Sequence, residues 1–124
     1  MPNDVELRFP AEVAYVSTLR ATAASLAARV DLTVDDIEDL RMAVGEACAV
    51  VLPGAAEGGE VAVAFGLSDH TLTVAVSVPA APGADPDTGG FGWQVLTALV
   101  TDAEVTHADG HLGVAFTMHS TVAP

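Results

Sequence analysis

The clearest hydrophobic repeat in the chain lies between residues 34 and 52. Its apolar side chains recur every three or four positions, at Ile37, Leu40, Val44, Cys48 and Val51. This spacing predicts an amphipathic helix. Thr33 and Asp36 stand where a capping box would begin it, and acidic side chains in its first turn suit the positive end of the helix dipole.

A second helical repeat precedes the first in the chain. Its apolar line is Val13, Val16, Leu19 or Arg20, Ala23, Leu26 and Val30. Alanine is frequent in this segment, which favours a helix and allows close packing. We expect the helix to open at Pro10, because proline is tolerated in a first turn, and to run to about Ala28.

The remaining apolar residues alternate with polar ones, as in half-buried strands. The predicted strands cover residues 5–9, 60–66, 71–78, 103–107 and 112–119. Residues 79–88 form a loop, and 89–100 a glycine-rich loop that leads into a short helix. The order β-α-α-β-β-α-β-β predicts an α+β two-layer sandwich, with the helices on one face of a mostly antiparallel mixed sheet.

The length and composition fit one folded domain over residues 1–124. Apolar residues make up 51% of the 124 residues, enough for a sizeable core. No run approaches the roughly 18 apolar residues of a membrane span. The start M-P-N-D-V-E lacks the apolar stretch of a signal peptide, so we expect a cytoplasmic protein.

The chain is strongly acidic, with a net charge of −13 from 17 acidic and four basic residues. This charge repels phosphate backbones and anionic lipids, so we expect neither nucleic-acid nor membrane binding. Two interpretations stay open. The acidity could attract a protein partner with a basic surface, or it could serve only to keep an apolar domain in solution.

Two charged side chains stand out within the predicted helices. Glu46 lies mid-helix among small and apolar residues, where it is either a solvated glutamate or a base held near a reacting group. Arg20 has no carboxylate three or four residues away in either direction. It is either a solvated helix arginine or a partner-facing one.

Other candidate chemistry in the sequence is weaker. Gly89, Gly90 and Gly92 precede or open a helix, where bare N–H groups can bind phosphate, although such glycines often make only a turn. His107, His111 and His119 lack a further ligand at zinc spacing, so no metal site is predicted. Cys48 lies on the apolar stripe and is expected to be a buried structural thiol.

Taken together, the segments resemble a known family along nearly the whole chain. V-E-L-R-F-P-A, D-D-I-E-D-L-R-M-A-V-G-E-A-C-A and G-F-G-W-Q-V-L-T-A-L-V-T-D-A-E-V are similar to bacterial anti-sigma-factor serine kinases. These kinases are small members of the histidine-kinase/Hsp90-type (GHKL) ATPase superfamily. The resemblance implies the Bergerat ATPase fold, ATP and magnesium as cofactors, a homodimer, and a sigma factor and an anti-anti-sigma antagonist as partners.

The same resemblance assigns roles to individual positions. It makes Glu46 the base that activates a serine hydroxyl of the antagonist, Gly90 and Gly92 part of the second glycine box, and Arg20 a contact for the partner. At Val50 the family has a magnesium-binding asparagine, and within residues 77–81 it has an adenine-binding aspartate, but here both are missing. Residues 79–88 are also short for the family's lid.

These departures predict a scaffold that keeps its protein partners while its ATP chemistry is weak or lost. The first hypothesis is therefore an anti-sigma factor that acts by sequestration. The alternatives are an active kinase that phosphorylates the antagonist, and a non-catalytic interaction module with another partner.

Overall fold

A computed structural model describes residues 4–121 of the chain. Residues 1–3, which include the start of the segment analysed for a signal peptide, and residues 122–124 lie outside the described part. The helices are α1 (Val16–Arg29), α2 (Val34–Val51) and α3 (Phe91–Leu99), and the strands are β1 (Val5–Pro10), β2 (Glu60–Ser68), β3 (Thr71–Pro79), β4 (Thr101–Ala108) and β5 (His111–His119). Short 3-10 turns, at Val13–Tyr15 and Leu52–Gly54, precede α1 and follow α2.

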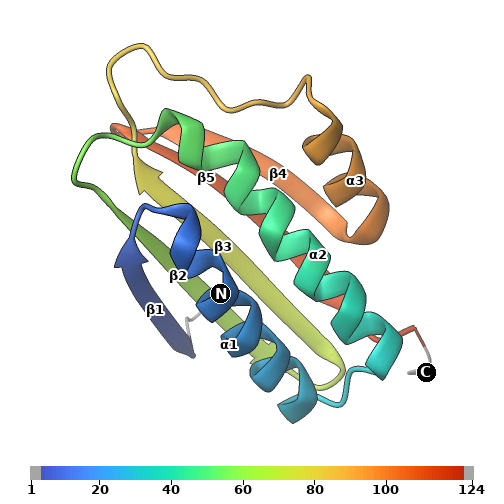
Figure 1. Cartoon of the computed structure of the whole chain (residues 1–124). Coiled ribbons are helices and arrows are strands. Elements are labelled where there is room, and N and C mark those ends of the chain that lie inside the picture. Colours follow the sequence, from blue (N-terminus) through green and yellow to red (C-terminus); the bar gives the residue numbers. More distant parts are fainter. Residues whose placement is uncertain (1–3, 122–124) are drawn as a thin grey trace.

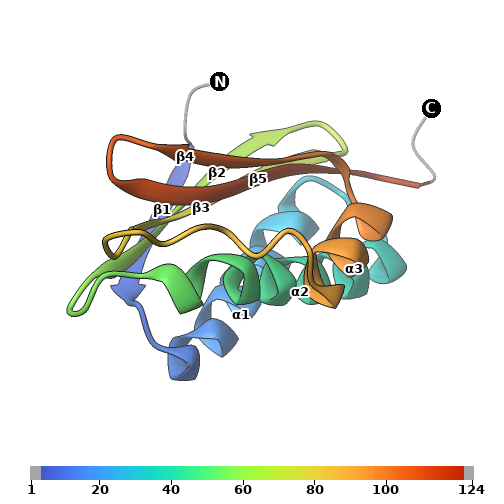
Figure 2. The same ribbon diagram turned by 90° about the horizontal axis from the view of Figure 1, so that it is seen from above.

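The molecule has two layers (Figure 1). Viewed from above, the sheet forms one layer and the three helices form the other, so one face of the sheet carries no helix (Figure 2). The strand order is β1-β2-β3-β5-β4. The predicted α+β sandwich is confirmed, except that all four strand pairings are antiparallel and the sheet is not mixed.

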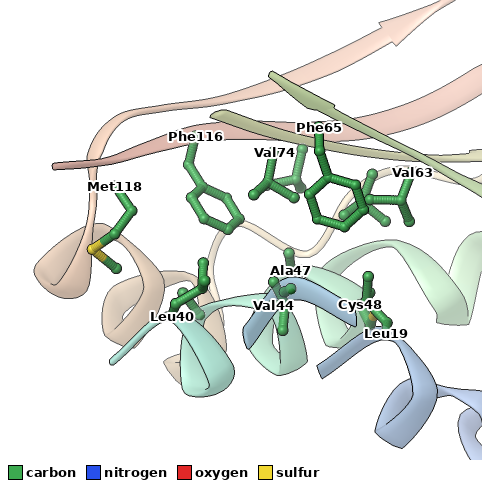
Figure 3. Close-up of a cluster of buried hydrophobic side chains, with 14 of the residues drawn as sticks. Leu19, Leu40, Val44, Ala47, Cys48, Val63, Phe65, Val74, Phe116 and Met118 are labelled. Carbon is green, nitrogen blue, oxygen red and sulfur yellow. The ribbon is translucent and has the colours of Figure 1, made fainter. Parts of the chain in front are cut away.

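The core lies between the helices and the covered face of the sheet. Its strand residues are alternate positions along the strands, such as Val63, Phe65, Val74 and Phe116. Figure 3 shows these side chains facing Leu19 of α1 and a row on α2 formed by Leu40, Val44, Ala47 and Cys48. Burial of each large apolar side chain contributes about 1.5–3 kcal/mol, so the packing of α1 and α2 against the sheet supplies most of the stabilisation.

The start of the first helix differs from the prediction. Pro10 is the last residue of β1, opposite Glu60, and does not open a helix. The backbone N–H of Ala11 donates to Gly59, and Glu12 is still extended, at φ −133° and ψ 139°. Because β1 continues to pair with the chain around residue 60, the helical conformation starts three residues later, and Val13 is left 76% exposed.

The start of α2 is fixed by a reciprocal cap. Thr33 Oγ1 accepts from the backbone N–H of Asp36, and Asp36 Oδ2 accepts from the backbone N–H of Thr33. The same carboxylate oxygen accepts from the N–H of Thr121, 3.1 Å away, and so ties the end of the chain to α2. Burial by itself raises the pKa of Asp36, but these hydrogen bonds with Thr33 and Thr121 outweigh it and hold the pKa below its usual value.

The lowered pKa of Asp36 leads to a prediction about stability and pH. The ionised carboxylate stabilises the fold fully above the ordinary aspartate pKa of about 4, and this contribution is lost as the pH falls through the lower folded-state pKa. We expect Asp36→Asn to lower the unfolding free energy by about 1–2 kcal/mol at pH 7. Urea unfolding of both proteins between pH 7 and pH 3 measures this.

The difference between the two proteins should shrink toward pH 3, because the wild-type carboxylate is then protonated. Asp35→Asn, an exposed change in the same first turn, is the matched control and should behave as the wild type to within about 0.5 kcal/mol. A constant difference across the whole pH range would contradict the assignment.

Candidate functional site

Glu46 and the glycine segment (residues 89–92) lie far apart in the sequence but next to each other in the structure. α3 packs against α2, and its residue Gly92 lies directly opposite Glu46. A Cβ atom at Gly92 would lie only 2.6 Å from Glu46 Oε2, so glycine is what permits this approach. Glu46 itself is half-buried. The resemblance predicts these two positions in one site, and the structure brings them together.

A second carboxylate faces the start of α3. Gly90 is the N-cap residue of this helix, and a Cβ there would lie 2.8 Å from Asp87 Oδ2. The first turn of α3 therefore has Asp87 on one side and Glu46 near Gly92. Negative side chains are favourable at a helix N-terminus, because the free N–H groups there carry partial positive charge. A bound phosphate would occupy the same kind of position.

The loop between β3 and α3 lies on the C-terminal end of α2 (Figure 1). The backbone N–H of Ala81 donates to the carbonyl of Gly54 at 2.8 Å, and that of Asp87 donates to the carbonyl of Val50 at 3.5 Å. Gly54 has no room for a side chain, because Ala84 and Leu112 pack against it. The side chain of Val50 is 3% exposed and provides no oxygen atom for a metal ion.

An exposed contact between a histidine and a carboxylate connects this loop to the sheet edge. His107 Nδ1 on β4 lies 3.5 Å from Asp85 Oδ1. Both side chains are well solvated, so the pair contributes little to stability. The other two histidines of interest have separate partners: His111 Nδ1 is 3.1 Å from the carbonyl oxygen of Asp109, and His119 Nδ1 is 3.2 Å from Thr71 Oγ1.

The structure does not gather the histidines into a metal site. Within residues 4–121, no group of three or more His, Cys, Asp and Glu side chains could hold a metal ion. In the same part of the chain, no helix is both long enough and apolar enough to cross a membrane.

Arg20 lies on the other side of α2 from Gly92. Its guanidinium group crosses α2 at Gly45, where a side chain would collide with it, and its Nε donates to the carbonyl of Arg41 at 3.3 Å. Among residues 4–121, no carboxylate lies within ion-pair distance of this guanidinium. A cavity of about 170 Å³ adjoins it, lined mainly by apolar residues of α1 and α2 and by Val13.

Sequence reasoning missed two features of this site. Asp87 was not singled out, although its place three residues before Gly90 in D-P-D-T-G-G was visible. The contact of Arg20 with Gly45 was missed because the two residues are on different helices. Periodicity indicates which face of a helix is buried, but not which residue of a neighbouring helix it meets.

Comparison with known proteins identifies the family. The family described as the histidine kinase-like ATPase domain matches residues 9–118. This chain belongs to that family. The match covers all three helices, strands β2 to β4, nearly all of β5 and the Glu46–Gly92 contact, but only the last two residues of β1. It confirms the resemblance to GHKL-type ATPases.

Several curated relatives carry the name serine-protein kinase RsbW. Those of Bacillus thuringiensis (strain Al Hakam) and Bacillus cereus (strain AH820) are each 37% identical to this chain over 75 residues. The aligned part is 59% of this chain and 47% of each relative. The chain thus spans about half the length of the curated relatives it matches.

A solved structure supports the fold. The RsbU and RsbW domains of Rv1364c from Mycobacterium tuberculosis align over 93% of this chain and 32% of that one, with a TM-score of 0.71. The identity is 23%, so this likeness bears on the fold alone. It agrees with the two-layer arrangement described above.

The environment of Cys48 gives a prediction about thiol reactivity. Burial raises the pKa of this thiol to about 11, although the charge of Arg20 partly opposes the rise. The thiolate is the reactive form, so we expect native protein at pH 8 to react with Ellman's reagent at least ~100-fold more slowly than urea-unfolded protein. The absorbance of the released thiolate follows both reactions, and equal rates would contradict this buried environment.

Proposed function

We propose that this protein is an anti-sigma factor that sequesters a sigma factor of RNA polymerase, with its ATP chemistry weak or lost. An anti-anti-sigma antagonist would compete for the protein and release the sigma factor. The support is the family membership, the names of the RsbW relatives, and one observation in particular. The start of α3, which corresponds to the family's second glycine box, faces the carboxylate of Asp87.

The electrostatics around the glycine segment argue against a bound triphosphate. A polyphosphate at the first turn of α3 would lie beside the carboxylate of Asp87, in a protein of net charge −13. A magnesium ion normally neutralises part of the phosphate charge, and it needs oxygen ligands. Val50 stands where the family has a magnesium ligand, and it is buried under the loop. The negative charge of the phosphates would therefore stay uncompensated.

The region where the family recognises adenine is also altered. Residues 77–81 contain no acid, and several of their backbone groups already have partners. Ala80 donates to the carbonyl of Gly110, and the carbonyl of Pro79 accepts from Ala56. A purine ring would therefore find no carboxylate here, and the backbone groups of Pro79 and Ala80 named above already have partners. These features support weak or absent binding of ATP.

Sequestration itself needs only a docking surface. We assign part of that surface to Arg20, whose guanidinium edges an apolar cavity and has only a carbonyl partner in the described structure. Residues 1–124 would act as one domain, in the cytoplasm where RNA polymerase is found. Nucleic acid and membranes are not partners in this proposal.

The alternative is an active serine kinase. It is favoured by Glu46, the candidate base, and by its contact with Gly92 in the glycine segment. In this case Glu46, Gly90 and Gly92 would hold and activate the reacting groups, and ATP with magnesium would be the cofactors. Nucleotide binding separates the two functions, since a kinase must bind ATP.

The first test is calorimetric titration of the purified protein with Mg-ATP. We expect a dissociation constant of about 1 mM or weaker, because the metal ligand is absent and the carboxylate of Asp87 faces the phosphate position. The Bacillus cereus RsbW protein serves as the reference. A micromolar dissociation constant for the wild type would support the kinase and contradict the proposed loss of ATP chemistry.

A variant pair examines the charge argument directly. In the Val50→Asn background, which restores an oxygen at that position, Asp87→Asn should tighten Mg-ATP binding by about tenfold. Asp85→Asn, in the same loop but paired with His107, is the matched control and should change it little. Equal effects of the two substitutions would mean that the position of Asp87 is unimportant.

The second test concerns sequestration and Arg20. RNA polymerase core enzyme is loaded in turn with each sigma factor of the host, and run-off transcription is measured with and without this protein, in the absence of added antagonist. We expect inhibition with one sigma factor, and Arg20→Glu should weaken it at least ~30-fold, since interface arginines often dominate binding energy.

Arg29→Glu is the control, because Arg29 is exposed on the same helix and changes the net charge equally. Circular dichroism must show that both variants are folded, since Arg20 also contacts Arg41. Arg20→Lys keeps the charge and should retain more inhibition than Arg20→Glu. Inhibition of no sigma factor would favour an interaction module with another partner.

A further inference from the structure

The face of the sheet that carries no helix (Figure 2) has a hollow of about 410 Å³ beside edge strand β4. The strands β2, β3 and β5 contribute only uncharged residues to its lining. The strand register places the small ones in two neighbouring rows across the sheet. These small residues, which form the floor of the hollow, are Ala64, Thr73, Ala75, Ala115 and Thr117.

Two carboxylates border the hollow on the side of β4. Asp102 and Glu104 both line it, and both are exposed. Glu104 is the register partner of Ala115, so it continues a row of small residues to the edge of the sheet. The register shifts between Thr101 and Glu104, and Asp102 has a φ of 54°. Such bulges redirect side chains at a sheet edge, and here both acids border the same hollow.

Neither carboxylate has a basic partner in the structure. Within residues 4–121, no basic side chain lies within ion-pair distance of Asp102 or Glu104. Arg8 is on the same face, but it lies on the opposite edge strand β1, with β2, β3 and β5 between them. Four strand spacings amount to about 19 Å, which is more than twice the Debye length of about 8 Å at physiological salt. The two negative charges therefore stand together uncompensated, and a cation beside them would relieve their repulsion.

The floor of the hollow shows that acidity on this face is localised. The chain has 17 acidic residues, but the floor residues are alanine and threonine. If acidity served only to keep the domain in solution, the acids would be expected to spread over such an open face. An uncharged floor with carboxylates on one side is instead the complement of a cationic group that has an apolar body.

We propose that this hollow is a docking site for an arginine side chain of a protein partner with a basic surface. A planar guanidinium can lie on the methyl groups of the floor and donate two N–H groups to one carboxylate. The hydroxyl of Thr73 donates to the carbonyl of Gly66 at 3.4 Å, which leaves its oxygen as a further acceptor. The net charge of −13 would attract such a partner over a long range.

The partner would bind to the opposite layer from Arg20. Arg20 crosses α2 at Gly45, in the helical layer, whereas the hollow is on the sheet face that points away from the helices. One molecule could therefore bind this partner and a protein docked at Arg20 at the same time. The inference uses neither Arg20 nor the nucleotide region, so it does not rest on the proposed function.

The test is an NMR titration of isotope-labelled protein with two blocked tripeptides, acetyl-glycyl-arginyl-glycine amide and its lysine counterpart. We expect the arginine peptide to shift amide signals around the hollow, at Ala75, Ala115 and Glu104, with a dissociation constant of about 1–10 mM. The lysine peptide should bind at least ~3-fold more weakly, because an ammonium group lacks the planar fork that matches a carboxylate. Equal affinities, or shifts spread over the acidic residues of both layers, would overturn the proposal.

Two kinds of variant separate charge from shape. Asp102→Asn combined with Glu104→Gln removes both charges and should weaken binding of the arginine peptide about tenfold, and asparagine tolerates the positive φ of position 102. Asp35→Asn combined with Glu38→Gln is the matched control. These two acids are exposed on α2, and their loss changes the net charge equally, so the dissociation constant should change less than about twofold.

Ala75→Leu keeps the charge and fills the floor of the hollow, so it should weaken binding at least ~5-fold. Wild-type affinity in the variant that lacks both carboxylates would contradict their role and overturn the proposal. Signals of the open face that shift with the protein's own concentration would mean that a second copy covers this surface, which would also overturn it. The titration needs neither nucleotide nor sigma factor, so its failure is distinct from that of the proposed function.

Discussion

The packing of α2 is the constraint on which the rest of this structure depends. One side of the helix is sealed against the sheet by Leu40, Val44, Ala47 and Val51, while α1 and α3 pack on its flanks. Its start is fixed by the Thr33–Asp36 cap and by the link to Thr121. A helix held in this way presents its remaining side chains in fixed positions. The positions of Glu46 and of the α2 backbone that contacts Arg20 both depend on this packing of α2.

Glycines set the distances at which other elements approach α2. Gly45 gives room for the Arg20 guanidinium, Gly92 lets α3 come close to Glu46, and Gly54 admits Ala84 and Leu112 beneath the loop. In each case a methyl group would force the neighbour away. The two candidate functional regions, around Glu46 and around Arg20, thus lie on opposite flanks of one helix, and a change in one flank need not disturb the other.

In the proposed function, this separation allows the domain to lose nucleotide chemistry and still bind its partners. The changes concern the flank next to α3, where Asp87 faces Gly90 and the loop covers Val50. Arg20 and its apolar cavity lie on the flank next to α1. In the proposed function, the loss of nucleotide binding leaves the fold intact. The core lies between α2 and the sheet and does not depend on the nucleotide site.

The sequence by itself determined the order of the elements and the identity of the buried face. Period-two and helical spacing depend only on residues close together in the chain. They therefore identified the five strands and α2, and they placed the thiol of Cys48 in the core. The same local rules placed the start of α1 at Pro10, which was wrong, because the pairing of β1 with residues 59 and 60 overrides the helix preference there. Only the tertiary structure decided that Asp87 faces Gly90, that Gly92 meets Glu46, and that Arg20 crosses Gly45. These contacts join residues from separate elements, and their distances follow from how the layers pack, which no spacing along one chain encodes.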